Sequence, residues 1–449
     1  MSTHRVNRYR LFNPGSRYYE SGTFTFIPPG RAWEFSGWRD EQESWKNTCY
    51  IGDWTHNLAE LNVKGPGALK FLADISINSY AKFDIGQGKH IVQCNPRGKV
   101  ASEGVVLRLS DDEFVIESNI FWAHYQFETA RPKYNARASY VISEYNGMRT
   151  VGERFKFQVS GPNALPLLEK VTNQSLRSVA FMRYQPIRIA NHDLIALRMG
   201  MAGEIGFELQ GPLEHANEIH QAIFEAGKAF GIRRLGKRTS MINHLEACFP
   251  TGWFHYVPAV YDDDAAGYCE HLRRHSPLGL VPTITGSFEG KDISEYYRSP
   301  VEMGWGKSIK FDHPFIGREA LEKEVASPIR TVVTLEFDGD DVIDIYASMF
   351  RSEQPYDMLE IPYPPTWVAH TDQVLKDGRP IGVSTTPGYS LHFRKVLSLA
   401  YLEVAHTRPG EEVTIVWGNP GTPQKQVRAT VASAPYKKDN RFADLSRVG

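Results

Sequence analysis

The chain has 449 residues, a formal net charge of -1 and 41% hydrophobic residues. This length predicts two or three domains, and the near-neutral charge gives no reason to expect nucleic acid or an anionic membrane as a partner. No apolar run is long enough to cross a bilayer, and residues 1–19 lack the apolar segment of a secretory signal. Four scattered cysteines without a CxxC pair predict reduced thiols in a cytoplasmic protein, with no disulfide framework and no metal site.

The N-terminal region differs in composition from the rest of the chain. Residues 1–45 are rich in Arg, Tyr, Phe, Pro and Gly and show no helical periodicity. We therefore expect residues 1–48 to form an irregular arm over the body of the protein, with a short strand at Phe24–Gly30 closed by a proline turn.

A sequence pattern occurs twice, as VKGPGALKFL at Val63–Leu72 and as VSGPNALPLL at Val159–Leu168. In each copy, alternating strand residues run into a Gly-Pro turn, and a proline here favours the first turn of a helix. The copies lie 96 residues apart, which indicates a duplicated α+β half and not a solenoid repeat. A duplicated body usually places its ligand between the halves.

Between the copies, residues 90–95, 100–109 and 114–119 are separated by turn sequences and predict an antiparallel meander. Asn95 ends the first of these strands, where turn capping is its expected role. Glu103 lies in the otherwise apolar second strand, so it is either exposed at an edge or raised in pKa within a cleft.

The stretch RMGMAGEIGFEL, Arg198–Leu209, has a glycine at every third position and two carboxylates, Glu204 and Glu208. It follows a strand-like segment and precedes a helical pattern over 214–229. Glycine permits positive φ and close approach of the backbone to a flat ligand. A carboxylate beside it can accept two parallel hydrogen bonds from the 2-amino, N3–H edge of a pterin. From the spacing alone, a glycine-rich turn with solvated glutamates is the alternative.

Further along, a second helix is expected at Lys237–Cys248, and residues 261–299 are expected to be rich in loops. From residue 327 the pattern changes to short strands, which predicts a small antiparallel barrel with a mostly polar tail at Asp439–Gly449. We therefore divide the chain into an arm (1–48), a body (49–326) and a barrel (327–449).

The standard nucleotide and hydrolase motifs are missing, because the chain has no GxxxxGK[ST], no GxSxG, no HExxH and no correctly placed GxGxxG. His56 and His244 are candidate catalysts, although a lone histidine is more often structural. His244 and Glu246 share a predicted helix and could reach the same cleft. The aromatic run 253–256 is either core or one wall of an aromatic slot.

Three stretches match, in the same order, the pattern of one known family. PVEMGWGKSIKFDHPFIGREAL at Pro300–Leu321 is similar to P-x-E-x-G-x-G-x-x-[VI]-K-x-D-x-x-F-I-G-R-x-A-L, and Pro380–Val413 and Arg198–Leu209 are similar to two further family stretches. They resemble the aminomethyltransferase, or glycine-cleavage T-protein, superfamily over about residues 49–431. The resemblance implies an α+β, three-domain fold, in which two duplicated halves surround a folate site and a C-terminal antiparallel β-barrel follows.

The resemblance also implies which residues hold tetrahydrofolate, the cofactor of this family. The family carboxylate that binds the pterin edge matches Glu208. The arginine that opens the family's A-R-D-x-L-R-L-E-A helix matches Arg238, although two extra residues separate it here from LEA. The family's Q-G-P reads S-G-P with Ser160, and Gln158, two residues earlier on the same strand face, could take the place of the glutamine.

One departure from the family bears on the reaction. The acidic pair that serves aminomethyl transfer reads Ser102-Glu103 here, which argues against glycine-cleavage chemistry. With its long N-terminal arm and the segment TGWFHY, the chain more closely resembles the bacterial tetrahydrofolate-dependent O-demethylases of methoxylated benzoates, of the vanillate and syringate type. This resemblance implies methyl transfer from an aryl ether to N5 of tetrahydrofolate, giving 5-methyltetrahydrofolate and a phenol.

Such a reaction needs a hydrogen-bond or proton donor for the ether oxygen, because phenoxide is a poor leaving group. His56 and His244 are the candidate donors, with Tyr256 third, and Trp253 and Phe249 are the expected aromatic walls of the cofactor and substrate site. A benzoate carboxylate would need an arginine or lysine. The strand FVIESN carries neither, so the substrate is anchored elsewhere or is not a simple benzoate.

Two other functions stay open. A folate-dependent demethylase of a sulfonium or methylamine would use carboxylates and aromatic faces, which Glu103, Trp253 and Tyr256 could supply. A non-catalytic folate-binding protein is the third possibility. The expected partner is a small methoxylated aromatic compound, without nucleic acid or membrane, and the protein is expected to be a monomer or a homodimer.

Overall fold

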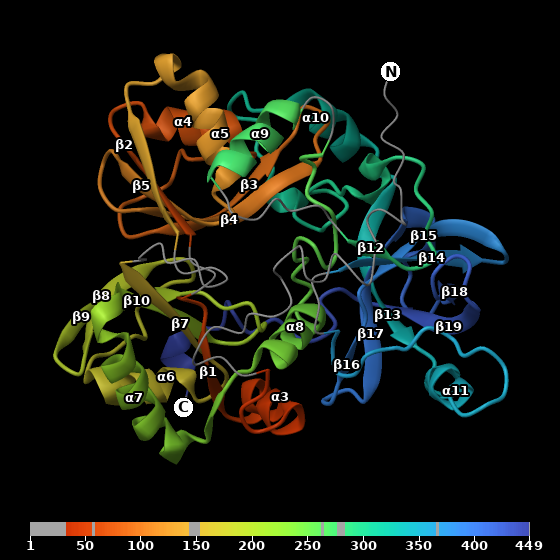
Figure 1. Ribbon diagram of the computed structural model, residues 1–449. Coiled ribbons are helices and arrows are strands. Elements are labelled where there is room, and N and C mark those ends of the chain that lie inside the picture. Colours follow the sequence, from red (N-terminus) through yellow and green to blue (C-terminus); the bar gives the residue numbers. More distant parts are fainter. Residues whose placement is uncertain are drawn as a thin grey trace.

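The computed structural model describes residues 33–55, 59–142, 153–261, 265–275, 283–364 and 368–448. His56 and the strand expected at Phe24–Gly30 lie outside the described residues. Figure 1 shows three lobes, each built on one sheet, arranged around the centre of the molecule. In the described part of the chain, no helix has the length and apolar character needed to cross a membrane.

The first lobe contains the predicted meander. Its strands pair in the order β3-β4-β5-β2-β6, and every pair is antiparallel. Helices α4 and α5 pack on one face through a cluster that includes Phe71, Leu72 and Phe127. The elements are β2 (Ala59–Lys64), α4 (Ala68–Ile75), β3 (Gly88–Cys94), β4 (Val100–Arg108), β5 (Glu113–Ser118), α5 (Phe121–Ala130) and β6 (Arg137–Ile142).

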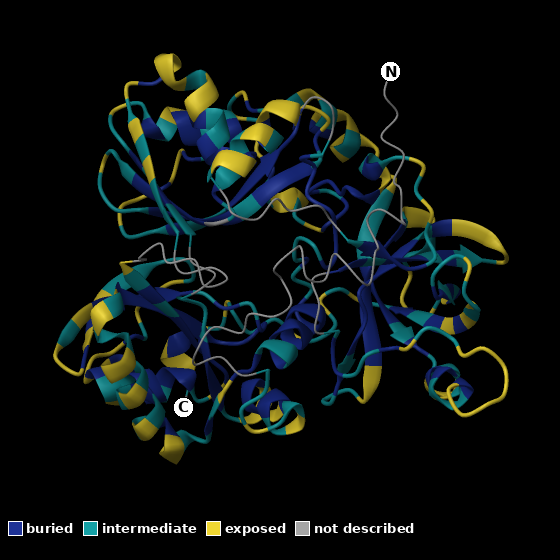
Figure 2. Ribbon diagram, in the orientation of Figure 1, coloured by how far each residue is buried: buried dark blue, intermediate teal, exposed yellow. Residues whose placement is uncertain are grey.

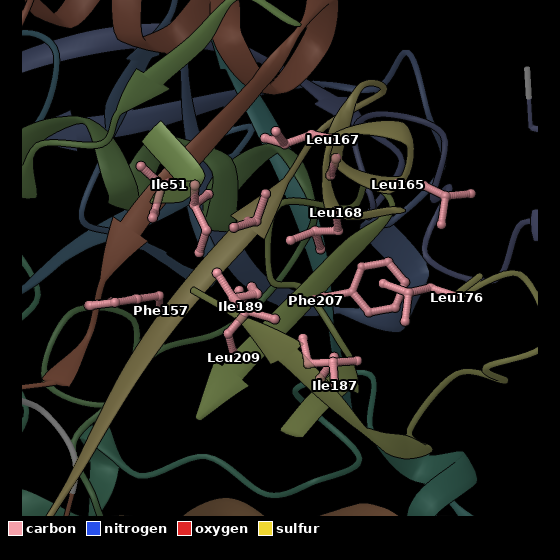
Figure 3. Packing of buried hydrophobic residues seen from close by; sticks show 14 of the residues in the cluster. Ile51, Phe157, Leu165, Leu167, Leu168, Leu176, Ile187, Ile189, Phe207 and Leu209 are labelled. Carbon is pink, nitrogen blue, oxygen red and sulfur yellow. The ribbon is translucent and has the colours of Figure 1, made fainter. Parts of the chain in front are cut away.

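The second lobe has a sheet of order β11-β1-β7-β10-β9-β8. Leucines of α6, among them Leu165 and Leu168, pack against sheet residues such as Phe207 and Leu209 to form its core (Figure 3). The elements are β1 (Cys49–Asp53), β7 (Arg154–Ser160), α6 (Ala164–Thr172), β8 (Tyr184–Ile189), β9 (His192–Arg198), β10 (Gly206–Pro212), α7 (Ala216–Gly227) and β11 (Ile232–Arg234).

The two copies of the Gly-Pro pattern have the same local structure. Gly65 and Gly161 have φ of +132° and +126°, and a Cβ at either would lie within 2.7 Å of a backbone carbonyl oxygen. Only glycine fits such a position. Each turn leads into a helix, α4 or α6, that begins two residues after the proline, so the proline lies in the turn and does not open the helix as predicted.

The third lobe is the predicted barrel. Its strands pair in the order β14-β15-β17-β13-β19-β18, and β18 pairs again with β14, which closes the sheet. The predicted boundary at residue 326 falls between α10 and β13 and stays a prediction. The elements are β12 (Ile284–Thr285), α10 (Arg318–Ala326), β13 (Arg330–Phe337), α11 (Gly339–Ser348), β14 (Ala369–Lys376), β15 (Arg379–Thr385), β16 (Gly388–Ser390), β17 (Lys395–Glu403), β18 (Glu412–Trp417) and β19 (Lys425–Ala432).

Three segments are more ordered than the sequence predicted. The arm contains helix α3 (Trp38–Asn47), and the region expected to be rich in loops contains helix α9 (Ala266–His275). The polar tail packs against the second lobe, where Leu445 is only 1% exposed within the core. Each segment buries a few separated side chains, such as Trp45 of α3, and so few apolar residues give a weak periodic signal. Figure 2 shows the buried positions of the described helices facing the sheets.

Candidate active site

The described residues enclose a cavity of about 900 Å³ to which all three lobes contribute. Strands β4 and β5 of the first lobe, β7 and β10 of the second, and helix α8 (Lys237–Glu246) with the loop that follows it form much of its wall. The predicted site residues that line it are Glu208, Arg238, His244, Phe249, Trp253 and Tyr256. A ligand site between the duplicated halves is therefore supported by the geometry.

Glu208 lies at one side of this cavity in a buried group of charges. Its strand pairs with β7 so that Glu208 is directly opposite Gln158, and Lys156, two residues before Gln158, faces the same way. The Lys156 ammonium nitrogen is 2.9 Å from Glu208 Oε2 and 3.0 Å from Oε2 of Glu117 on β5. Lys156 thus joins the two halves and places a positive charge beside Glu208.

The one ammonium group of Lys156 is shared by two carboxylates. Burial raises the pKa of Glu208, an effect that the positive charge of Lys156 opposes and Glu117 reinforces. Burial works against the charge of Lys156, but Glu117 and Glu208 outweigh it and raise the pKa of this lysine. Lys156 therefore stays charged at neutral pH and favours the carboxylate form of Glu208.

Gln158 lies directly opposite Glu208 on β7 but is not among the residues that line the cavity. The Tyr50 hydroxyl donates to Gln158 Oε1 at 2.8 Å. The Gln158 Nε2 is buried and has no hydrogen-bond partner among the described residues. A buried donor without a partner costs free energy unless a ligand accepts from it.

The glycines of Arg198–Leu209 serve mainly to pack the chain against itself. A Cβ at Gly206 would lie 2.8 Å from Ser160 Oγ, and one at Gly203 would lie 2.8 Å from the Lys437 side chain. Only Gly200 lines the cavity among the three. Glu204 is buried and binds Lys437 at 3.1 Å, so the alternative of a solvated glutamate is wrong for this residue, which holds the C-terminal segment.

His244 faces the cavity from α8. Its Nδ1 is 2.9 Å from Thr251 Oγ1, and that hydroxyl donates to the Phe249 carbonyl at 3.2 Å. The hydroxyl hydrogen is thus used, so His244 Nδ1 is the donor and its Nε2 carries the lone pair. Burial lowers the pKa of His244 to about 4, and the imidazole is neutral at neutral pH.

Tyr256 and the aromatic residues before it form another part of the wall. Tyr256 is buried, and burial raises the pKa of its hydroxyl well above the ordinary value. The ring of Trp253 meets that of Tyr261 edge to face at 5.7 Å, and the ring of Phe249 meets that of His244 at 5.4 Å. Helix α8 and the loop after it therefore bring together two hydrogen-bonding groups, His244 and Tyr256, and two aromatic faces, Trp253 and Phe249.

Two residues of α8 that were expected at the ligand site, Arg238 and Glu246, pair with other protein groups. Arg238 lines the cavity but also pairs with Glu34 at 3.3 Å. Glu246 does not line it and accepts hydrogen bonds from Trp45 Nε1 at 2.9 Å and Ser390 Oγ at 2.6 Å. Glu246 therefore joins the arm, α8 and the barrel, and the expectation that it reaches the cleft is wrong.

Asn95 and Glu103, the two polar residues singled out in the meander, have roles that the sequence analysis had named. Asn95 Oδ1 accepts from the backbone N–H groups of Arg97 and Lys99 at 3.1 and 3.0 Å, which confirms the turn cap. Glu103 lines the cavity and pairs with His90 at 3.1 Å.

Lys156 and Glu117 are the residues that sequence reasoning missed. Lys156 lies between Phe155 and Phe157, both of which point into the core of the second lobe. Side chains alternate along this strand, so Lys156 and Gln158 lie on the same face. The choice of Gln158 as a site residue could therefore have predicted Lys156 as its neighbour. No sequence pattern near Glu117 indicated its role, because its partner, Lys156, lies in another lobe.

Comparison with known proteins agrees with this geometry. Residues 9–254 match the GCVT N-terminal domain family, and residues 358–437 match the glycine cleavage T-protein C-terminal barrel domain. The chain belongs to the glycine-cleavage T-protein, or aminomethyltransferase, family. The family, the fold and the enzyme class of one-carbon-group transferases are thereby confirmed.

Members of this family match nearly the whole chain. A sesamin methylene transferase of Sinomonas sp. is 33% identical over 95% of this chain and 94% of its own length. A syringate O-demethylase of Sphingobium sp. is 33% identical over 94% of each chain. The structure of an aminomethyltransferase from Bartonella henselae matches with a TM-score of 0.64 and 17% identity over 95% of this chain and 97% of that one, which shows the shared fold.

Proposed function

We propose that the protein is a tetrahydrofolate-dependent O-demethylase that moves a methyl group from a methoxylated aromatic compound to tetrahydrofolate. The observation that carries the proposal is one cavity lined by the buried carboxylate Glu208, by His244 of α8 and by the aromatic loop after α8 with its buried Tyr256. Two relatives of full length are named for removing a methyl group and for transferring a methylene group. These names support one-carbon transfer.

The residues around Glu208 fit a pterin. The carboxylate form of Glu208 can accept from the 2-amino and N3–H groups. Lys156 supplies a positive charge that favours this form against the effect of burial. Trp253 and Phe249 would provide apolar faces, and Arg238 stands at the wall. When bound, tetrahydrofolate would supply the nitrogen that accepts the methyl group.

Tyr256 is the best candidate among the described residues for hydrogen bonding to the ether oxygen. As the methyl–oxygen bond breaks, both electrons stay on that oxygen, and the developing charge needs a donor. Tyr256 keeps its proton at neutral pH because its pKa is raised. The N–H proton of the accepting nitrogen would be lost to solvent when the methyl group replaces it, and solvent supplies the proton that converts phenoxide to phenol on release, so no net proton is consumed.

His244 suits a different role. Its neutral ring is held by Thr251 through Nδ1, which leaves Nε2 as an acceptor. A ring hydroxyl of the substrate would be a matching donor. His244 would thus orient the substrate, and His56 stays a candidate donor in the sequence.

Glu103 is the residue on which a cationic substrate would depend. A sulfonium or methylammonium group would need a carboxylate beside the aromatic faces, and Glu103 lines the cavity with its Oε2 3.1 Å from His90 Nε2. The geometry allows such a substrate, and we rank the aryl ether first because one full-length relative is named for O-demethylation.

The test uses the purified full chain with tetrahydrofolate and a substrate panel. The panel holds methoxybenzoates, a neutral methoxyarene, a methylenedioxy-substituted arene, a sulfonium and a methylamine. We expect 5-methyltetrahydrofolate and the matching phenol in equal amounts from at least one methoxyarene. Turnover of a sulfonium or methylamine without turnover of any aryl ether would overturn the proposal, and binding of tetrahydrofolate without turnover would indicate a folate-binding protein.

A further inference from the structure

Three histidines meet between helices α5 and α9, away from the groups used above. His124 lies on α5, and His271 and His275 lie four residues apart on one face of α9. One ring nitrogen from each lies within 4.8 Å of the other two, and His124 Nδ1 is 3.0 Å from His271 Nε2. None of the three lines the cavity.

The surroundings suit a metal site. The Tyr140 hydroxyl is 2.8 Å from His275 Nδ1, which leaves Nε2 of that ring for a metal. A hydrogen bond to the second nitrogen fixes the ring and its tautomer, as in known histidine–metal sites.

We propose that His124, His271 and His275 bind a divalent transition metal ion, with Zn²⁺ as the best match, and that the ion clamps α9 to α5. Three neutral imidazoles favour zinc-type ions over Mg²⁺ or Ca²⁺, which prefer oxygen ligands. Binding draws the three nitrogens together to the spacing of a tetrahedral site with Zn–N distances of about 2.0–2.1 Å. Water completes the fourth position.

The clamp would act on the wall of the cavity. Tyr268 and Leu272 lie on α9 and line the cavity, while His271 and His275 contact α5 from the same helix. Tyr268 also packs on Trp122 of α5 at 5.1 Å. A metal at the three histidines would therefore hold this wall in place without touching a bound substrate.

The first experiment measures metal binding to the full-length chain without a histidine tag. The protein is dialysed against Zn²⁺ or Mg²⁺ and its metal content is measured. We expect about one Zn²⁺ and no Mg²⁺ per chain, a melting temperature that rises with Zn²⁺ concentration, and visible d–d bands of low-coordinate geometry with Co²⁺. A chain that retains no Zn²⁺ and shows no such Co²⁺ bands would overturn the proposal and leave a hydrogen-bonded histidine pair only.

Variants locate the site. His271→Asn should abolish binding, and Tyr140→Phe should weaken it about 10–100-fold because the support for His275 is lost. The control His215→Asn removes a histidine from another stacked pair, His192 and His215, with ring centres 3.7 Å apart, and should bind Zn²⁺ as the wild type does. Melting without metal checks that each variant folds. Unchanged Zn²⁺ binding by a folded His271→Asn variant would contradict the assignment.

Discussion

Glu208 is a buried carboxylate whose properties are set by residues from two other strands. It is 1% exposed, and an isolated charge at such a position would be costly. Lys156 on β7 offsets part of this cost, while Glu117 on β5 shares the same ammonium group and adds a second carboxylate. An ion pair from a neighbouring strand therefore holds the carboxylate that a ligand would meet.

Replacing Glu208 by glutamine should weaken tetrahydrofolate binding. The amide loses the charge-assisted acceptor, and hydrogen bonds to charged groups contribute about 1.5–3 kcal/mol, so we expect a dissociation constant roughly 10–100-fold higher by titration calorimetry. The matched control Glu214→Gln changes an exposed glutamate of the same lobe and should bind as the wild type does. An unchanged affinity in Glu208→Gln would remove the pterin assignment.

Replacing Tyr256 by phenylalanine should slow catalysis while leaving binding nearly intact. Loss of the donor to the developing phenoxide predicts a fall in kcat of about 10²-fold, with KM little changed. Because the pKa of Tyr256 is raised well above its ordinary value, the wild type should not lose activity through this hydroxyl near pH 10. A Tyr256→Phe enzyme with full kcat would leave His56 as the candidate donor.

At the scale of elements, α8 and the loop after it hold two neutral histidines. His255 Nδ1 accepts from the Thr251 backbone N–H at 2.9 Å, which requires an unprotonated nitrogen. Burial, together with the neighbouring His244, lowers the pKa of His255 to about 3. The shape of this loop is thus tied to the protonation of its histidines.

Acidification should therefore destabilise the protein. The ordinary histidine pKa of about 6.5 lies above the folded value of about 4 for His244, so the unfolded chain binds more protons between these values. The stability is fully present above pH 6.5 and falls as the pH falls toward 4, by on the order of 3 kcal/mol. Denaturant titrations at several pH values measure this.

His255 should add a loss of the same kind, because its pKa is also lowered, and the variant His255→Asn tests this contribution. The asparagine oxygen can still accept from Thr251 but does not titrate, so the free energy of unfolding should depend less on pH in this range. An unchanged slope would show that His255 does not contribute to the loss.

The close contact of β10 with β7 depends on Gly206. A methyl group there would meet Ser160 Oγ at 2.8 Å and Ser160 Cβ at 3.0 Å, so Gly206→Ala should lower the free energy of unfolding by about 1–3 kcal/mol. In the control Gly339→Ala, nothing lies within 4 Å of the new atom, and stability should not fall. Equal effects of the two variants in denaturant titrations would contradict the packing role.

At the scale of the whole molecule, the chain returns at its end to a lobe that it formed much earlier. Arg198 donates to the Arg441 carbonyl at 3.0 Å, and Lys437 lies 3.1 Å from Glu204 and 3.7 Å from Glu246. The segment after the barrel therefore ties the second lobe to α8.

Truncating Leu445 should test this connection. The side chain is fully enclosed in the core of the second lobe, so Leu445→Ala should cost about 2–5 kcal/mol of stability in denaturant titrations. Arg447→Ala, a change at an exposed side chain two residues away, serves as the control and should have little effect. A loss below about 0.5 kcal/mol for Leu445→Ala would mean that the C-terminal segment does not contribute to the core.

The local patterns of the sequence predicted much of the fold. The meander, the duplicated Gly-Pro turns, the helix at α8 and the closed barrel all carry signals within a few residues of themselves, through strand alternation and turn chemistry. Helices α3 and α9 and the packed tail were not predicted, because their few buried residues, such as Trp45 and Leu445, depend on partners far along the chain.

Some features of the candidate site were likewise predictable from local sequence, and others were not. The sequence by itself determined the family resemblance, and it singled out Glu208 as the candidate pterin carboxylate and the aromatic loop as a candidate wall, since these rest on ordered motifs. Only the tertiary structure decided that Lys156 and Glu117 accompany Glu208, that Glu204 and Glu246 are structural, and that three histidines meet between α5 and α9. Ion pairing, burial and the approach of the histidine rings depend on contacts between segments that are distant in the chain. The order of residues in the sequence does not show which distant segments come into contact.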